Sequence, residues 1–236
     1  MSKMERPFDE ELKSLKEMLL EMAARAEEQI ALAIRALRER EEPLACQVLD
    51  REEAVNRLDV EVDQMCMRLL ALRQPLATDL RFITAAMKIG TDLERIGDLA
   101  VNIAERTLDL LKSPELKPLI DIPRMAELAQ AMVRDALNAF VQGDDALARD
   151  VCLRDDQVDQ LNSQVFRELL TYMMQDPGTI PRAVDLILVG RHLERIADHA
   201  TNIGEDMIYM VEGRIVRHTQ EVSDRPKNSD EKISNN

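Results

Sequence analysis

The sequence has few of the residues that build sheets and nucleotide-binding loops. Its 236 residues include no Trp, four Phe, two Tyr, seven Gly and nine Pro. This scarcity, together with many Ala, Leu, Met, Glu and Arg residues, favours helices over strands. No glycine-rich loop is present, which excludes the usual backbone cradle for a phosphate group. We therefore expect an all-α chain.

Cysteine is also scarce. Cys46, Cys66 and Cys152 are odd in number, scattered, and form no CxxC pair. This pattern disfavours a disulfide frame or a zinc site and favours reduced cysteines in a cytoplasmic protein.

Long apolar runs are missing. No run approaches the roughly 18 residues that a membrane span requires, and the start MSKMERPFDEEL does not resemble a signal peptide. Hydrophobic residues nevertheless make up 45% of the chain, which is enough for a packed core. We expect a folded protein with no membrane span.

Basic residues are outnumbered, and the net charge is −14. No basic stripe with interleaved aromatics offsets this acidity, so nucleic acid is not an expected partner. Small anions would be repelled unless a cation mediated their binding. We therefore expect divalent cations or a basic protein surface as binding partners.

Hydrophobic periodicity predicts six helices. Apolar residues recur every three or four positions along the first stripe, which includes Leu15, Leu19, Met22, Ile30 and Leu37. The other helices are expected over about 43–73, 79–112, 125–141, 144–175 and 182–216, with Pro43 marking the break and restart after the first. Prolines and glycines lie between these helices and mark where each one ends. The expected units are a three-helix bundle at 8–112, a Pro-rich linker at 113–123, a second three-helix bundle at 124–216 and a disordered tail at 217–236.

An internal repeat supports two tandem units. The segment GTDLERIGDLAVNIAE begins at Gly90, and GRHLERIADHATNIGE begins at Gly190, with ten of sixteen positions identical. The preceding helices align at an offset of 103 residues, for example Glu52 with Asp155. Each half therefore reads as one up-down-up three-helix unit. Small residues such as Gly90 and Gly190 suggest a close helix approach that a side chain would block.

Acidic residues form a stripe on the side of each repeated helix that faces away from the apolar residues. The stripe comprises Glu94, Asp98, Asn102 and Glu105 in the first copy, and Glu194, Asp198, Asn202 and Glu205 in the second. The neighbouring helices add Glu52, Asn56, Asp59 and Asp63 in the first unit, and Asp155, Asp159 and Asn162 in the second. If these stripes face each other, hard oxygen ligands converge, and these suit Mg, Mn, Ca or iron.

Other interpretations of the stripes stay open. Arg95 and Arg195 could pair with the acids as ordinary surface ion pairs. His192 and His199 project to a different side from the acids and are expected to be packing or surface residues. No Glu-x-x-His pair of the ferritin-type di-iron bundles is present, which disfavours oxidase chemistry.

The segments LERIGDLAVNI, LERIADHATNI, RQP at 73–75 and TYMMQDPGTIP at 171–181 strongly resemble the PhoU family over about residues 8–217. The resemblance implies two tandem three-helix bundles, often a homodimer, in the cytoplasm and peripheral to the inner membrane through partners. The implied partners are the ATPase subunit of the phosphate ABC transporter and the sensor histidine kinase of the phosphate regulon. The implied role is negative regulation of phosphate uptake and of phosphate-starvation genes.

The family's (E/D)xxxD metal motifs match four positions of this sequence. They fall on Glu94/Asp98, Glu194/Asp198, Asp155/Asp159 and, with an amide in the second place, Glu52/Asn56. The resulting hypothesis is an adaptor, not an enzyme, with a divalent metal or iron and no organic cofactor. Two alternatives remain: a metal-dependent hydrolase of phosphate esters, and a docking scaffold without metal.

Overall fold

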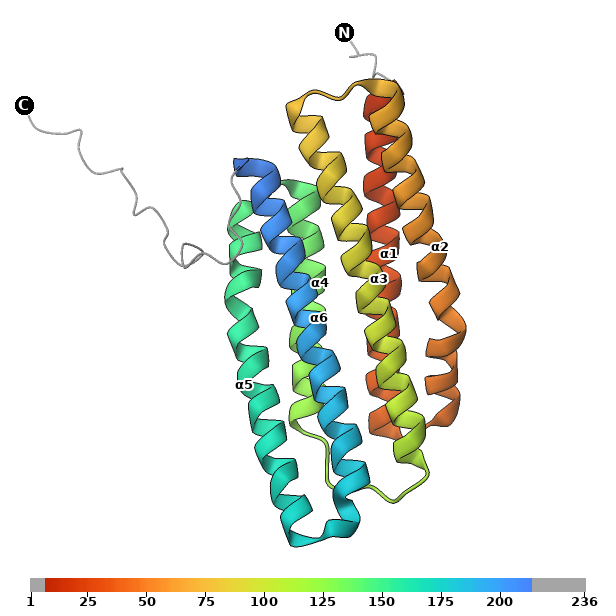
Figure 1. Cartoon of the computed structure of the whole chain (residues 1–236), viewed down its shortest axis with the longest axis vertical. Coiled ribbons are helices and arrows are strands. Elements are labelled where there is room, and N and C mark those ends of the chain that lie inside the picture. Colours follow the sequence, from red (N-terminus) through yellow and green to blue (C-terminus); the bar gives the residue numbers. More distant parts are fainter. Residues whose placement is uncertain (1–6, 214–236) are drawn as a thin grey trace, which may run out of the picture.

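The computed structural model describes residues 7–213, which form a bundle of six long helices (Figure 1). They are α1 (Pro7–Glu39), α2 (Glu42–Arg73), α3 (Ala77–Leu111), α4 (Asp121–Gln142), α5 (Asp145–Gln175) and α6 (Ile180–Glu212), with a short 3₁₀ turn, η1 (Pro177–Thr179), before α6. The expectation of an all-α chain with six helices is confirmed. The expected helix end at Val216 and the tail at 217–236 lie outside the described residues. None of the described helices has an apolar stretch of the length needed to cross a membrane.

The turn between α4 and α5 illustrates how the sequence ends and restarts a helix. Gly143 adopts a left-handed backbone conformation with φ of 71°, which suits glycine because it lacks a Cβ atom. The Asp144 side chain then accepts a hydrogen bond of 3.0 Å from the Leu147 amide and caps α5. This pair of residues reverses the chain within a few positions.

The linker between the units is shorter than expected, because α4 begins at Asp121 and not at residue 124. Pro123 therefore lies inside the first helical turn. The position tolerates proline because the first N–H groups of a helix have no intrahelical acceptor.

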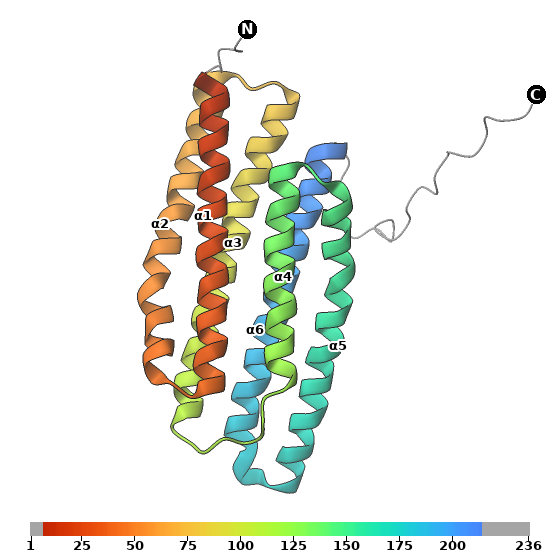
Figure 2. The same ribbon diagram turned by 180° about the vertical axis from the view of Figure 1, so that it is seen from behind.

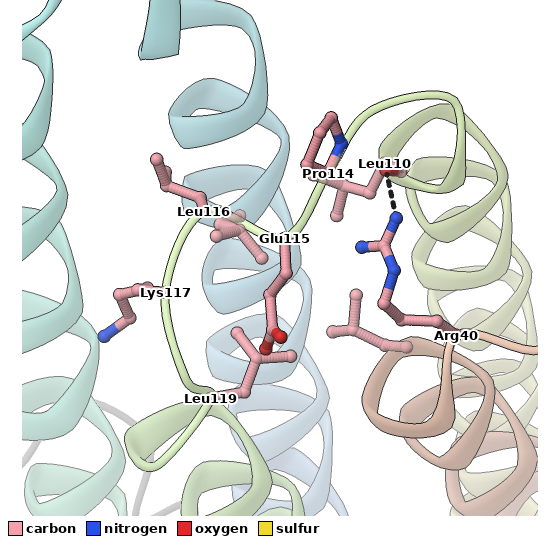
Figure 3. Close-up of a pocket in the computed structure, with 9 residues that line it drawn as sticks. Arg40, Leu110, Pro114, Glu115, Leu116, Lys117 and Leu119 are labelled. Carbon is pink, nitrogen blue, oxygen red and sulfur yellow. Dashed lines mark hydrogen bonds between the residues drawn. The ribbon is translucent and has the colours of Figure 1, made fainter.

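The linker is held in place from both units. Arg40 donates to the carbonyl oxygens of Leu110 (3.2 Å) and Ser113 (2.5 Å), and Arg182 of α6 donates to the Pro114 carbonyl oxygen. Figure 3 shows Arg40 reaching toward Leu110, whereas Lys117 points away from it toward α5. There the buried Lys117 ammonium pairs with Glu168. The connection is thus a fixed structural element.

The two units pack side by side, with α3 and α6 in the middle and α2 and α5 at the outer edges (Figures 1 and 2). Helices α3 and α6 are antiparallel, since residue numbers rise along one as they fall along the other in every pair that joins them. Lys88 pairs with Asp206 at 3.1 Å, and Arg106 pairs with Asp185 at 3.4 Å. Each of these pairs places the cation on α3 and the anion on α6.

One hydrophobic core runs through both units. The rings of Phe82 on α3 and Phe140 on α4 stack with centroids 5.1 Å apart, so apolar packing crosses from one unit to the other. The two units therefore share one hydrophobic core.

The glycines of the repeat lie where helices approach closely. A Cβ atom at Gly90 would meet Val62 Cγ1 of α2 at 3.1 Å. At Gly190 it would meet Asn162 Oδ1 of α5 at 2.9 Å. Both glycines thus let the repeated helix lie close to its outer neighbour, beside the acidic stripe.

Candidate functional site

In the first unit, the acidic residues of α3 meet Asp59 of α2. Burial raises the pKa of Glu94 above its ordinary value, and the negative charges of Asp98 and Asp59 raise it further. Burial also raises the pKa of Asp59, and Asp63 on the next turn adds to that rise. Glu94 and Asp59 therefore lie close enough to neighbouring carboxylates for their own ionisation to be disfavoured.

The residue of α2 that acts on Glu94 is not one of the matched motif positions. Asp59 lies three residues beyond Asn56, which is exposed, and seven beyond Glu52, which is partly buried. The position of Gly90 explains the choice, because a Cβ atom there would lie 3.6 Å from Asp59 Oδ1. The close approach of α3 to α2 at this glycine brings Asp59 to the stripe.

In the second unit, Asp159 and Asp198 lie close enough to Asp155 and Glu194 to raise the pKa values of those two carboxyl groups. The pKa of Asp155 is raised to about 6, first by burial and then by the charges of Asp198 and Asp159. Burial, and then the charge of Asp159, raise the pKa of Asp198. Burial and the charges of Asp198 and Asp159 raise the pKa of Glu194, whereas the charge of Arg191 lowers it. We call Asp155, Asp159, Glu194 and Asp198 the second acidic cluster.

Arginines contact part of both stripes. Arg95 lies 3.3 Å from Glu94 and 3.1 Å from Asp98, with half of its side chain exposed. In the second unit Glu194 pairs at 3.0 Å with Arg191, and not with the expected Arg195. Exposed pairs of this kind contribute little and exchange easily.

The two asparagines of the stripes behave differently from the acids. Asn202 turns toward α3, where its Nδ2 atom lies 3.5 Å from an oxygen of Asp92. Asn102 is partly buried on α3. Asn202 is thus directed toward α3, and the carboxylates are the stronger cation ligands because they carry a negative charge.

The donor chemistry of the stripes fits a hard cation, because carboxylates with raised pKa values gain from a nearby positive charge. Their present arrangement is open, however. Over residues 7–213, no group of three or more His, Cys, Asp or Glu side chains already surrounds a point where a metal ion could sit. Binding of an ion would require the carboxylates to turn inward, with Arg95 and Arg191 released.

The histidines do not join the acidic stripes. The Nδ1 atom of His199 lies 2.8 Å from an Asp92 oxygen across the α3–α6 contact. His192 is partly buried, and burial lowers its pKa, with the charge of Arg195 lowering it further. The three cysteines are free thiols.

Exposed apolar side chains near the turn between α5 and α6 were not predicted from the sequence. They form two series with four-residue spacing on these two adjacent helices: Phe166, Leu170 and Met174 on α5, and Ile180, Val184 and Leu188 on α6. We call these six residues the apolar strip. Met174 is 79% exposed and the others are 37–49% exposed. Apolar residues recurring every four positions beside the buried Val165 and Leu169 could have indicated it.

Comparison with known proteins gives a consistent result. The family model described as "PhoU domain" matches twice, at residues 19–107 and 122–207. The chain is 45% identical over 208 residues to the phosphate-specific transport system accessory protein PhoU homolog of Aquifex aeolicus (strain VF5), covering 88% of this chain and 94% of the relative. It is 42% identical to the homolog of the same name from Pseudomonas putida, covering 89% of this chain and 83% of the relative.

Two solved structures match the fold. The crystal structure of PhoU from Pseudomonas aeruginosa superposes with a TM-score of 0.85 at 40% identity, covering 88% of this chain and all of that one. The crystal structure of the phosphate transport system regulatory protein PhoU from Streptococcus pneumoniae gives 0.82 at 30% identity, covering 89% and 99%. The two matched segments lie within the two three-helix units, and both structures match nearly the whole described bundle.

Proposed function

The chain belongs to the PhoU family, and from this we propose that it is an accessory regulator of phosphate transport that works as an adaptor. It would connect the phosphate ABC transporter to the sensor histidine kinase of the phosphate regulon and keep uptake and starvation genes low when phosphate is plentiful. Its place would be the cytoplasm, peripheral to the inner membrane through these partners. Family members are accessory and regulatory proteins and not enzymes, so the hydrolase alternative has no support.

The observation that carries the adaptor role is the apolar strip. Six exposed apolar side chains on two adjacent helices are the kind of surface that a protein partner covers. The second acidic cluster lies on the same two helices, farther from the turn. A partner with a small apolar contact and a basic rim would match both features, and we propose the transporter's ATPase subunit as that partner.

The test uses two residues of the strip. Leu170→Gln and Val184→Gln place polar groups at the centre of the proposed contact, and both positions are about 42% exposed, so the core is little disturbed. Each should weaken binding to the purified ATPase subunit about tenfold, because burying such a side chain contributes about 1.5 kcal/mol. Leu20→Gln on α1, which is 38% exposed, is the matched control and should bind as the wild type does.

Binding is measured by interferometry, with the kinase's cytoplasmic region as a second arm. Loss of kinase binding alone would place the kinase on the strip instead, and unchanged binding of both partners would overturn the docking surface. In cells, a deletion strain should express phosphatase even in high phosphate. The wild-type gene and Leu20→Gln should restore repression, whereas Leu170→Gln should not.

We further propose that a divalent metal or iron binds the acidic residues of the stripes and reduces their repulsion. The second acidic cluster supports this, since its carboxyl groups outnumber the cations that contact them. Protein purified without chelator or nickel resin should contain metal by elemental analysis. The variant with Glu94, Asp98, Glu194 and Asp198 all replaced by Ala should contain none while keeping its helicity.

A scaffold without metal is the second candidate. It is favoured by the ion pairs that Arg95 already makes with Glu94 and Asp98. Equal metal content in the wild type and the four-Ala variant would favour this second candidate.

We also propose a homodimer, which sedimentation at several concentrations would test.

A further inference from the structure

A polar cavity lies between α1 and α2 in the first unit, apart from the acidic stripes and the apolar strip. It has a volume of about 300 Å³ and is lined by Arg25, Glu28, Gln29 and Arg51. Gln29 is only 1% exposed, and neither its Nε2 nor its Oε1 atom has a hydrogen-bond partner. A buried amide without partners destabilises a fold, so its presence in the core needs a reason.

The internal repeat shows that the fold itself does not require this amide. At the offset of 103 residues, Met22 and Ala26 align with Met125 and Ala129, and all four are fully buried. At the same offset Gln29 aligns with a methionine.

That residue, Met132, is also fully buried and has no polar group to satisfy. Gly97 of the first unit corresponds to Ala197 of the second at the offset of 100 residues. A Cβ atom at Gly97 would lie 3.2 Å from Gln29 Oε1, so the glycine leaves room for the amide. The Gln29 and Gly97 combination is thus specific to the first unit.

The charged residues of the cavity supply further donors. Arg25 pairs with Glu21 at 2.7 Å, and Arg51 pairs with Glu28 at 2.5 Å. All four side chains are 40–59% exposed, so these pairs are weak and can be exchanged. Each guanidinium also has more N–H groups than one carboxylate oxygen can use.

We propose that this cavity binds a small tetrahedral oxyanion, inorganic phosphate or sulfate. Two guanidinium groups and an amide N–H form a donor set that matches such an ion. The Gln29 Nε2 group would donate from the buried side, and Arg25 and Arg51 from the exposed side. The Glu28 carboxylate competes with the ion for Arg51 and turns to solvent when the ion binds. This site is separate from the apolar strip. A negative result for the cavity would therefore leave the adaptor proposal unaffected, and the reverse also holds.

The test is calorimetric titration of the full chain with inorganic phosphate, and in a second arm with sulfate, at an ionic strength held constant with sodium chloride. The wild type should bind at least one of the two ions saturably at one site. Gln29→Met combined with Gly97→Ala copies the second unit. It should keep the helicity, unfold at a higher temperature and bind about tenfold more weakly, a loss equal to about 1.4 kcal/mol.

Two single substitutions separate the oxyanion site from a merely structural amide. Arg51→Gln should weaken binding severalfold without unfolding the chain, because the residue is 40% exposed. Glu28→Gln should strengthen binding severalfold, since it removes the competing carboxylate. Absence of saturable binding to both ions in the wild type, or an unchanged affinity in the Met/Ala variant, would overturn the proposal. If that variant does not fold, unchanged affinity in Arg51→Gln decides against the site.

Discussion

The Nδ1 atom of His199 lies 2.8 Å from a carboxylate oxygen of Asp92, and this contact joins the two units at the middle of the α3–α6 pair. Both side chains are largely buried, at 17% and 15% exposure. The internal repeat places Leu99 and His192 at the corresponding positions, so the contact has no polar twin. Together with the Lys88–Asp206 and Arg106–Asp185 pairs, this contact favours one register between α3 and α6, because a shift would separate each charged group from its partner.

This contact should couple the two units energetically. In a double-mutant cycle with Asp92→Ala and His199→Ala, we expect a coupling of about 1 kcal/mol in the free energy of unfolding at neutral pH. Urea unfolding followed by circular dichroism measures it. The control cycle pairs Asp92→Ala with His192→Ala and should show coupling near zero. Equal values in the two cycles would mean that the contact contributes nothing specific.

The second acidic cluster should make stability depend on pH through Asp155. Its pKa of about 6 in the folded protein lies above the ordinary 3.8, so the folded state holds a proton that the unfolded state releases. Stability therefore falls as pH rises from about 4 to about 6, and the loss persists above that range. Asp155→Asn keeps the shape and removes the charge. It should raise the free energy of unfolding at pH 7 by about 1 kcal/mol, a value reduced for solvent screening.

The same substitution should have almost no effect at pH 4, where the native carboxyl group is already protonated. Asp156→Asn is the control, because it removes an equal charge from a neighbouring position on the same helix. Unfolding in urea at both pH values, with a chelator present, gives the comparison. Destabilisation by Asp155→Asn at pH 7 would show that the carboxylate is favourably held, contrary to the crowding described above.

The helices could be predicted from the sequence because their cause is local. Buried residues such as Leu15, Leu19, Met22 and Ile30 recur at helical spacing, and the structure buries all of them. The repeat also predicted two similar units. It could not predict the stacking of Phe82 on Phe140, because no periodicity within one helix states which other helix will cover it.

The candidate site shows the same division between local and non-local causes. The positions of Glu94 and Asp98 on one helix face followed from their four-residue spacing. The arrival of Asp59 beside them, in place of Asn56, depends on how closely α2 approaches Gly90. Gln29 interrupts an otherwise apolar stripe, and its alignment with Met132 in the repeat is a signal that the sequence alone contains.

The glycines of α6 should differ in their tolerance of a methyl group. At Gly204 a Cβ atom would lie 3.1 Å from the Ala148 carbonyl oxygen, a backbone atom that cannot turn away. At Gly190 it would meet the end of the Asn162 side chain, which can rotate. Gly204→Ala should therefore destabilise the protein by about 1 kcal/mol despite the better helix propensity of Ala, whereas Gly190→Ala should stay within about 0.5 kcal/mol of the wild type.

Unfolding in urea distinguishes these two variants. The first unit provides a control, because Ala104 is buried at the position that corresponds to Gly204. Ala104→Gly should cost about 1 kcal/mol from helix propensity alone. If Gly204→Ala were stabilising, the close contact between α6 and α5 would not be what keeps the glycine there.

The linker should depend on Lys117 and Glu168 unequally. The Lys117 side chain is 4% exposed and Glu168 is 38% exposed. Glu168→Leu leaves a buried ammonium without its carboxylate and should destabilise the protein by about 2 kcal/mol. Lys117→Met removes the buried charge and leaves a carboxylate that water can reach, so it should cost less than about 1 kcal/mol. The double variant should resemble Lys117→Met, because the unpaired charge is gone. Urea unfolding of the three variants checks this order, and equal losses in the two single variants would show that the ion pair is not what holds the linker against α5.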